Sequence, residues 1–264
     1  MPKNPLPYGP VKLNVGADTT RLPGFINVDI RSLGKDVRRG HASNLKFAPD
    51  HSVSVLFTHA VFEHVFVAQR LRALREWKRV TAPDGVIVCL GLPDFETIAR
   101  LYLDGATGIV GDRFDLFNVY RYTHGDPDGE VTRWRRWDPA LHPDSAPSGY
   151  VPQLHKGLFD QSHLAGLLRS ADIRAEMFRY AYPNEVHALS LGFVARGDGE
   201  YIEVVDGLAA LPDIGRFVNV DSIQVLSNET VGDEMTDRVI RLDARTLKRR
   251  LRSTAGRAVR RLRA

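Results

Sequence analysis

Short apolar runs alternate with segments of helical spacing along the first two hundred residues. Four of the runs are typical of buried strands: Val11–Gly16, Phe25–Ile30, Val53–Thr58 and Gly85–Leu90. Between the last two, apolar residues recur at the spacing of one helical face, at Val65, Ala68, Leu71 and Leu74. A second helix is predicted from 93–96 to about Leu103. This alternation predicts an α/β fold with a doubly wound, mostly parallel sheet that binds ligands at the carboxyl ends of its strands.

The second half of the chain is less regular. Residues 105–156 show no clean periodicity and are rich in Gly, Pro, His, Trp and Tyr, which favours a lid or substrate-binding insertion. Asp160 is predicted to cap a helix whose apolar face is formed by Leu164, Leu167, Leu168 and Ala171. Two strands are expected to follow, Ile173–Tyr180 and Ala188–Arg196. Residues 1–196 thus form the predicted main domain. Residues 197–264, with short β-like pieces that the core does not require, form a small C-terminal extension.

The composition is that of an ordinary globular protein. Of the 264 residues, 43% are hydrophobic and 26% are charged, which argues against disorder and collagen-like classes. No apolar run approaches the roughly 18 residues of a membrane span, and the first residues do not form a signal peptide. The single cysteine, Cys89, cannot form an internal disulfide. These features predict a cytoplasmic protein, and they make no prediction of its oligomeric state.

The basic charge is concentrated in a C-terminal tail. The segment 244–264 contains nine basic residues and no acidic one, so the rest of the chain has 27 basic and 32 acidic residues. Its apolar residues follow helical spacing, at Leu247, Leu251, Ala255, Val259 and Leu262. The tail is therefore predicted to be a basic amphipathic helix, either packed on the body or in contact with a membrane surface or polyanion. The body gives no reason to expect nucleic acid as a partner.

The first forty residues have the layout of a nucleoside-binding half-fold. A strand ends at Gly16, whose missing side chain lets a ligand approach the backbone, and the next strand ends at Asp29, whose carboxylate can accept both ribose hydroxyls. An ordinary strand-end turn with a solvated aspartate is the alternative. A dinucleotide site is less favoured, because G-x-G-x-x-G is absent.

Several segments, in order and at the right spacing, resemble class I S-adenosylmethionine-dependent methyltransferases, of the short type associated with glycan and natural-product O-methylation. They are KLNVGAD, GFINVDI, HASNLKF, FTHAVFEHV, LREWKRVTAPDGVIVCLGLPDFE and HKGLFDQSHLAGLLRSADI, within residues 12–196. The resemblance implies a Rossmann-like, seven-stranded-type sheet and S-adenosylmethionine as cofactor.

The resemblance also implies roles for single residues. Gly16 and Ala17 would back the methionine portion, Asp29 with the adjoining Ile30 would hold the ribose, Ala42 and Ser43 would flank the adenine, and Thr58 with His59 would stand where the methyl group is transferred. Two departures reshape this pattern: the glycine-rich loop is reduced to Gly16, and His41 stands where many relatives have an acid.

A hydroxyl acceptor needs a base, and histidine is the usual choice. The candidates are His59, just past the strand end that would face the sulfonium, His155, before the capped helix, and His124, in the predicted lid. For each, a structural histidine is the alternative. If His59 is the base, we expect activity to rise with pH through the ordinary histidine range.

No metal site is predicted. His59 and His64 lie five residues apart, whereas zinc motifs on helices place histidines four apart. A Mg²⁺ site built from Asp94, Glu96 or the lid acids stays open as an alternative, against helix-capping carboxylates.

The sequence thus predicts an O-methyltransferase acting on a hydroxyl of a saccharide or glycosylated metabolite, such as a mannoside precursor of a polysaccharide. Aromatic residues in the insertion suit the C–H faces of sugars: Tyr120, Tyr122, Trp134, Trp137 and Tyr150. A small natural product or lipid is the first alternative acceptor and RNA a lesser one. A degenerate, non-catalytic binding protein is the alternative from another class.

Overall fold

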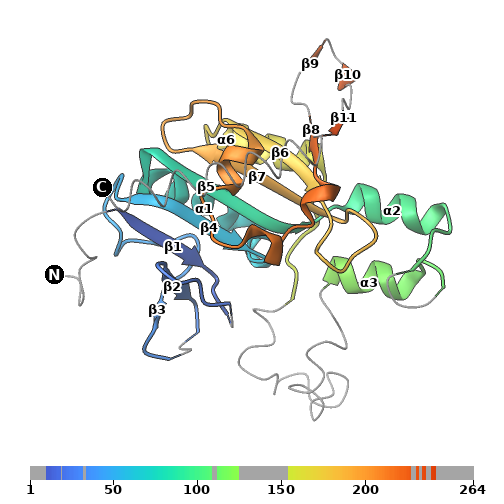
Figure 1. Cartoon of the computed structure of the whole chain (residues 1–264), viewed down its shortest axis with the longest axis horizontal. Helices are drawn as coiled ribbons and strands as arrows, with labels where there is room; N and C mark the ends of the chain where they lie inside the picture. Colours follow the sequence, from blue (N-terminus) through green and yellow to red (C-terminus); the bar gives the residue numbers. More distant parts are fainter. Residues whose placement is uncertain are drawn as a thin grey trace.

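The molecule is built around a single large β-sheet flanked by helices (Figure 1). The computed structural model describes residues 10–18, 20–31, 34–108, 112–124 and 154–226, together with strand residues at 230–231, 234–235 and 239–241. No described helix is long and apolar enough to cross a bilayer.

The sheet has the strand order β11-β8-β6-β7-β5-β4-β1-β2-β3. Its strands are β1 (Val11–Val15), β2 (Ile26–Asp29), β3 (Val37–Arg39), β4 (Val53–His59), β5 (Thr81–Pro93), β6 (Ala175–Tyr180), β7 (Ser190–Arg196), β8 (Gln224–Leu226) and β11 (Val239–Arg241). Strands β1 to β5 pair in parallel, whereas the pairs β5–β7, β7–β6, β6–β8 and β8–β11 are antiparallel. The order reverses between β1 and β4, which confirms the doubly wound α/β prediction.

The expected seven-stranded sheet is wrong in its strand number, because nine strands pair in it. Strands β8 and β11 extend the β6 edge and come from the predicted C-terminal extension. The remaining pair, β9 (Thr230–Val231) and β10 (Glu234–Met235), forms a separate hairpin. Strand β3 was not predicted, because of its three residues only Val37 is buried.

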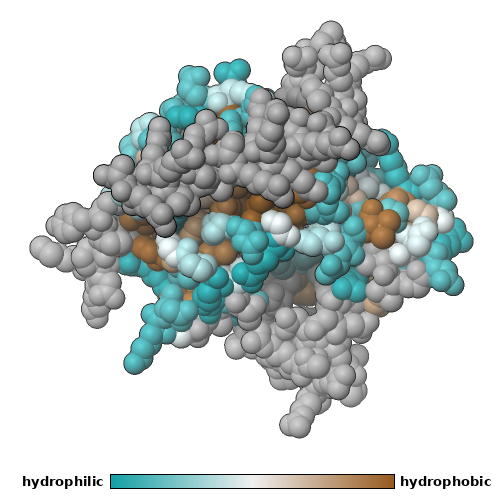
Figure 2. All heavy atoms as spheres, viewed as in Figure 1, coloured by the Kyte–Doolittle hydropathy of each residue, from teal (hydrophilic) through white to brown (hydrophobic). Residues whose placement is uncertain are grey.

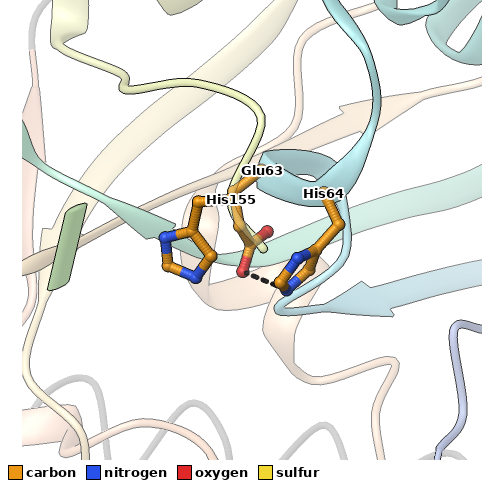
Figure 3. Close-up of side chains that lie close together, drawn as sticks. All are labelled: Glu63, His64 and His155. Atoms are coloured by element: carbon orange, nitrogen blue, oxygen red, sulfur yellow. Dashed lines mark ion pairs between the residues drawn. The ribbon is translucent and has the colours of Figure 1, made fainter. Parts of the chain in front are cut away.

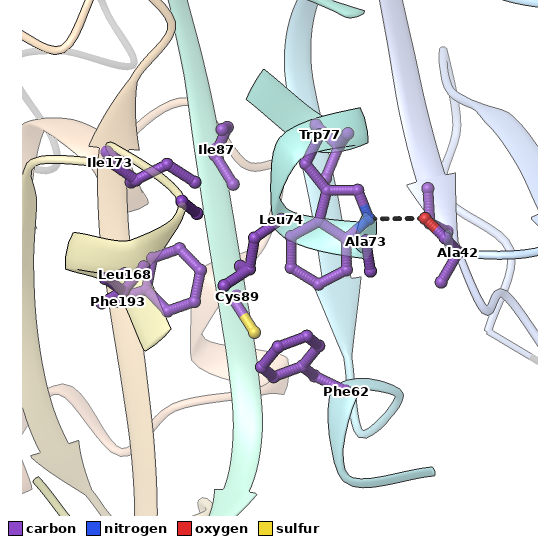
Figure 4. Close-up of a cluster of buried hydrophobic side chains, with 14 of the residues drawn as sticks. Ala42, Phe62, Ala73, Leu74, Trp77, Ile87, Cys89, Leu168, Ile173 and Phe193 are labelled. Carbon is purple, nitrogen blue, oxygen red and sulfur yellow. Dashed lines mark hydrogen bonds between the residues drawn. The ribbon is translucent and has the colours of Figure 1, made fainter. Parts of the chain in front are cut away.

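One face of the sheet is covered by α1 (Val67–Val80) and α6 (Gln161–Ser170). Figure 4 shows this core, in which Trp77 of α1 donates its Nε1 proton to the Ala42 carbonyl at 2.9 Å. The predicted cap of α6 is confirmed, because the Asp160 side chain accepts a hydrogen bond from the His163 backbone N–H at 2.7 Å.

The opposite face is covered by the segment after residue 200. It contains α7 (Val204–Leu208) and two short 3₁₀ helices, η3 (Ile214–Arg216) and η4 (Val220–Ser222). Apolar residues of this segment pack on the strands: Val204, Val205, Leu208, Leu211, Phe217 and Val218. The expectation that the core does not require these residues is therefore wrong. Of the two pieces expected to be β-like, 201–205 and 217–226, the first runs into helix α7 and the second ends in strand β8. In their described parts the β1–β2 and β2–β3 connections form no helix, so this face takes its cover from the C-terminal segment.

Part of the predicted lid is described. Helix α3 (Leu116–His124) packs against α2 (Phe95–Leu103) over a small core of Ile98, Phe114 and Leu189. Residues 125–153, which contain Trp134, Trp137 and Tyr150, lie outside the described residues, and so does the basic tail. In the face shown in Figure 2, hydrophobic residues form a band across the middle, and a smaller group lies over the α2–α3 end.

Two leucine truncations, one inside the C-terminal segment and one outside it, test the role of this segment. Leu208 is fully buried, whereas Leu103, at the end of α2, is 77% exposed. We expect Leu208→Ala to lower the free energy of unfolding by about 2–5 kcal/mol, because it leaves a cavity in the core. Leu103→Ala should change it by less than about 0.5 kcal/mol. Urea denaturation of both variants measures the difference, and equal small effects would mean that the sheet does not depend on this segment.

Candidate functional site

A cavity of about 440 Å³ opens at the carboxyl ends of β1, β2 and β4, where the strand order reverses. This is where doubly wound folds bind their ligands. Its size is within the range of small-molecule sites. Five of the predicted cofactor residues line it, namely Gly16, Ala17, Asp29, Ile30 and Ala42.

The other two predicted cofactor residues lie behind the wall of the cavity. Ser43 is buried, and its hydroxyl lies 2.8 Å from Nδ1 of His41, which does line the cavity. Thr58 is fully buried in β4, and its hydroxyl has no hydrogen-bond partner among the described residues. Ser43 thus holds a lining residue in place, while direct contact of Ser43 and Thr58 with a cofactor stays a prediction.

The Asp29 carboxylate sits at the tip of β2 and is almost completely buried. One of its oxygens accepts a hydrogen bond from the Asp18 backbone N–H at 2.9 Å, and the other accepts two from Arg31, from the backbone N–H at 2.9 Å and from Nε at 3.1 Å. Arg31 also pairs with the Asp18 carboxylate at 2.6 Å. These contacts hold the carboxylate in one orientation at the cavity wall.

Gly16 makes the turn between β1 and the cavity. Its φ of +76° is unfavourable for residues with a side chain, and its N–H donates to the Val28 carbonyl at 2.7 Å. A Cβ on Gly16 would lie only 2.1 Å from Cγ2 of Val61, in the loop after β4. The glycine was expected to make room for a ligand, but the structure shows that Val61 fills the space of its side chain. Gly16 therefore holds the ends of β1 and β4 close together.

His59, the last residue of β4, lines the same cavity. Its ring packs against Phe217 and Tyr182, with centroids 5.1 and 5.5 Å away, and its Nε2 is buried and makes no hydrogen bond to any residue that the structure describes. Burial lowers the pKa of His59 to about 4, because the charged form loses its hydration. The ring is therefore neutral at ordinary pH and has a nitrogen lone pair available.

His155 meets His64 rather than His59. The two rings lie edge to face with centroids 4.9 Å apart, and Nε2 of His64 lies 3.7 Å from a carboxylate oxygen of Glu63 (Figure 3). Burial raises the pKa of Glu63 to about 8 and lowers those of His64 and His155 to about 4. Sequence reasoning weighed His64 only against His59 and missed Glu63, because a charged residue in a short turn gives no sign of its burial.

The remaining candidates lie apart from the cavity. His124 is exposed, stacks on Tyr120 at 4.6 Å, and has its Nδ1 2.8 Å from the Thr123 hydroxyl. Asp94, where a Mg²⁺ site was left open, is fully buried and paired with Arg179, which also lies 3.7 Å from Glu96. Each carboxylate thus faces an arginine, and neither belongs to the group of described residues that could hold a metal ion, so the structure does not support Mg²⁺ there.

The family described as "Methyltransferase domain" matches residues 23–89, from the start of β2 into β5. No curated protein matches the sequence. Among solved structures, a Thermotoga maritima SAM-dependent methyltransferase described as a "possible histamine N-methyltransferase" is 17% identical, with coverage of 73% of this chain and 84% of its own and a TM-score of 0.43. The 1,6-didemethyltoxoflavin-N1-methyltransferase of Burkholderia thailandensis, solved with S-adenosylhomocysteine, is 15% identical over 70% of each chain, with a TM-score of 0.40.

The contact between Gly16 and Val61 can be tested with a matched glycine. Gly24 has nearly the same φ, +77°, but open space where its Cβ would lie. Gly24→Ala should lower the free energy of unfolding by about 1–2 kcal/mol through backbone strain alone. Gly16→Ala should cost about 1–3 kcal/mol more, because its methyl group collides with Val61.

The double variant separates the two contributions. In a Val61→Ala background, where the colliding methyl groups are absent, Gly16→Ala should cost no more than Gly24→Ala does. Chemical denaturation of the four variants gives the comparison, and an undiminished cost in the Val61→Ala background would show that the collision is not the cause.

Proposed function

We propose that this S-adenosylmethionine-dependent methyltransferase transfers its methyl group to a hydroxyl of a saccharide or glycosylated metabolite, for which a mannoside precursor of a polysaccharide is one example. The matched methyltransferase domain supports the reaction class. The observation that carries the proposal is the cavity at the switch point, with a buried carboxylate on one wall and a neutral histidine on another. A small natural product or lipid is the second candidate acceptor.

The described residues fit the cofactor. The Asp29 carboxylate has lone pairs left after its three hydrogen bonds, and we assign it to the ribose hydroxyls. The turn at Gly16 and Ala17 exposes backbone for the methionine portion, and Ala42 presents a small side chain to the adenine. The bound cofactor would supply an activated methyl group on a positively charged sulfur.

Methyl transfer is an in-line displacement, so the protein contributes mainly alignment and exclusion of water. As the oxygen–carbon bond forms and the carbon–sulfur bond breaks, the acceptor hydroxyl must lose its proton. We assign the proton to the imidazole of His59, which is neutral and lines the cavity. The neutral thioether S-adenosylhomocysteine then leaves. His59 is preferred over His155, which does not line the cavity.

The mouth of the cavity suits a polar acceptor with apolar faces. Phe66 is 54% exposed, and the Lys156 ammonium lies 5.6 Å from the centre of its ring. Both residues line the cavity, together with Arg31. An aromatic ring can stack on the C–H face of a sugar while a cation binds its hydroxyl oxygens. This pairing supports a saccharide over a purely apolar acceptor.

The ribose assignment predicts a loss of cofactor-product affinity. Asp29→Asn should weaken S-adenosylhomocysteine binding by about 2 kcal/mol, roughly 30-fold, because the ribose loses a charged acceptor. Asp36→Asn, which removes an exposed partner of Arg21 at the surface, should leave affinity unchanged. Calorimetry gives both values.

A ligand analogue tests the ribose contact without changing the hydrogen bonds between Asp29 and Arg31. The 2′,3′-dideoxy analogue of S-adenosylhomocysteine should bind the wild type about as weakly as Asp29→Asn binds the parent compound. It should lose little further affinity in Asp29→Asn. If the two losses add in full, Asp29 does not hold the ribose.

The base assignment predicts a loss of turnover. His59→Ala should lower kcat by about 10²-fold while S-adenosylhomocysteine affinity stays within a few-fold, because a proton acceptor matters only as the bond forms. Since burial keeps His59 neutral down to about pH 4, the expected rise of activity moves from the ordinary histidine range to near pH 4. His163→Ala, at an exposed position of α6, is the control. A few-fold loss of kcat in His59→Ala would assign the reaction to alignment alone.

A further inference from the structure

Three potential metal ligands converge beside the cavity, and none of them is used by the proposed reaction. Glu63 and His64 belong to η1 (Phe62–His64), directly after the cavity-lining end of β4, and His155 lies ninety residues further along the chain. One ligand atom from each residue lies within 4.8 Å of the other two. In Figure 3 the three side chains lie close together, with the Glu63 carboxylate between the two rings.

The two chain segments are tied to each other by their backbones. The Lys156 N–H donates to the Glu63 carbonyl at 2.7 Å, and Nδ1 of His64 lies 3.1 Å from the Leu154 carbonyl. The two bonds involve Leu154 and Lys156, the residues directly before and after His155. The three side chains are therefore held together by the fold rather than by chance proximity on a surface.

The hydrogen bond of His64 determines where its proton is. A carbonyl oxygen can only accept, so Nδ1 of His64 must be the donor. In the neutral ring Nε2 then has a lone pair, and this lone pair faces a Glu63 oxygen at 3.7 Å. Two lone pairs facing each other repel unless a proton or a cation lies between them. A histidine with one nitrogen bound to a backbone carbonyl and the other free is also the usual arrangement of a metal ligand.

The other groups of the cluster also lack partners. The Glu63 side chain is 1% exposed, and its second oxygen, Oε2, has no hydrogen bond among the described residues. Nδ1 of His155 is buried and has no hydrogen-bond partner among the described residues, although the backbone of Tyr122 and Thr123 lies close to the ring. Buried polar atoms without partners are costly, and a bound ion would satisfy all of them at once.

We propose that Glu63, His64 and His155 form a binding site for a divalent transition-metal ion of the zinc class. Two histidines and one glutamate with an open fourth position are the ligand set of catalytic zinc sites. On a tetrahedral ion, such ligand atoms lie about 3.4 Å apart. The 3.7 Å contact is already near this value, and the longest separation, 4.8 Å at most, needs to close by little more than about 1 Å.

The charges nearby favour this class of ion over Mg²⁺ or Ca²⁺. The guanidinium of the buried Arg70 acts on Glu63, and Lys156 and Arg31 act on His64, so the site offers one carboxylate among several positive groups. Hard cations need several oxygen ligands to offset such repulsion, whereas nitrogen ligands bind zinc-class ions strongly.

The position of the site suggests what the ion does, and this step rests on the proposed function. His64 lines the cavity, so an ion bound to it would lie beside the space next to the cofactor pocket. An acceptor hydroxyl bound there would have a lowered pKa and would give up its proton to His59 more readily.

Metal binding can be tested without any methyl transfer. Protein treated with EDTA and dialysed should bind one equivalent of Zn²⁺ by calorimetry, and one equivalent of Co²⁺ should give the strong visible absorption of a tetrahedral site. Glu63→Gln, which keeps the shape of the side chain, and His155→Ala should each weaken Zn²⁺ binding about 100-fold or more, since even the loss of an outer-sphere partner costs 10–100-fold. Zn²⁺ should raise the unfolding temperature of the wild type but not that of Glu63→Gln.

Exposed histidines provide the control. His163→Ala and His51→Ala should bind Zn²⁺ as the wild type does, because His163 is exposed on α6 and His51 is exposed at the end of β4 opposite to the cluster. Loss of binding in either control, unchanged binding in Glu63→Gln and His155→Ala, or no stoichiometric binding at all would overturn the metal site. The last result fits a proton shared between Glu63 and His64 instead.

Methyl-transfer assays on saccharides separate this proposal from the proposed function. One outcome is a protein that binds no Zn²⁺ and is equally active after EDTA treatment and after addition of Zn²⁺. This result overturns the site and leaves the methyltransferase assignment intact. Stoichiometric Zn²⁺ binding by a protein that methylates no saccharide supports the site and overturns the acceptor.

Discussion

The close approach of the β1 and β4 ends is the constraint on which the site depends. Val61 occupies the volume that a side chain at position 16 would need, so only glycine allows the two strand ends to meet. The same turn brings two backbone N–H groups onto the Val28 carbonyl, which fixes β2 and with it Asp29. On the other side, β4 ends with His59 at the cavity, and the loop after it leads into Glu63 and His64. One packing contact thus positions the residue assigned to the ribose, the residue assigned to the proton and two of the proposed metal ligands.

The two buried carboxylates beside the cavity differ in how far their hydrogen bonding is satisfied. Asp29 is buried with three hydrogen bonds, so its carboxylate is held in place before any ligand binds. Glu63 is buried, its Oε2 has no partner within the described part of the chain, and burial raises its pKa to about 8 despite the attraction of the buried Arg70. The first carboxylate is a completed structural unit that a nucleoside can add to. The second is incomplete, and a proton or a cation is needed to complete it.

The parts of the fold that bury apolar side chains at a regular period could be predicted from the sequence. Examples are helix α6 with its Asp160 cap and strands β1, β2, β4, β5, β6 and β7. The small residues Gly16, Ala17 and Ala42 and the acid Asp29, which line the cavity, could also be predicted. Strand β3 could not be predicted because two of its three residues are charged, and α7 because Val204 and Val205 are β-branched. The Glu63–His64–His155 cluster depends on a backbone pairing ninety residues apart, and local patterns contain no information on such a pairing.

The C-terminal segment both covers the sheet and contributes to the site. A fold whose β1–β2 and β2–β3 connections have no described helix leaves one face of its sheet open, and residues 204–226 close it. The closing residues reach the site itself, because the Phe217 ring packs 5.1 Å from both Phe57 and His59. Water is thereby excluded from one side of His59, and this desolvation is the cause of its low pKa. The proton affinity of the candidate base is therefore set by a segment that the sequence pattern assigns to the periphery of the molecule.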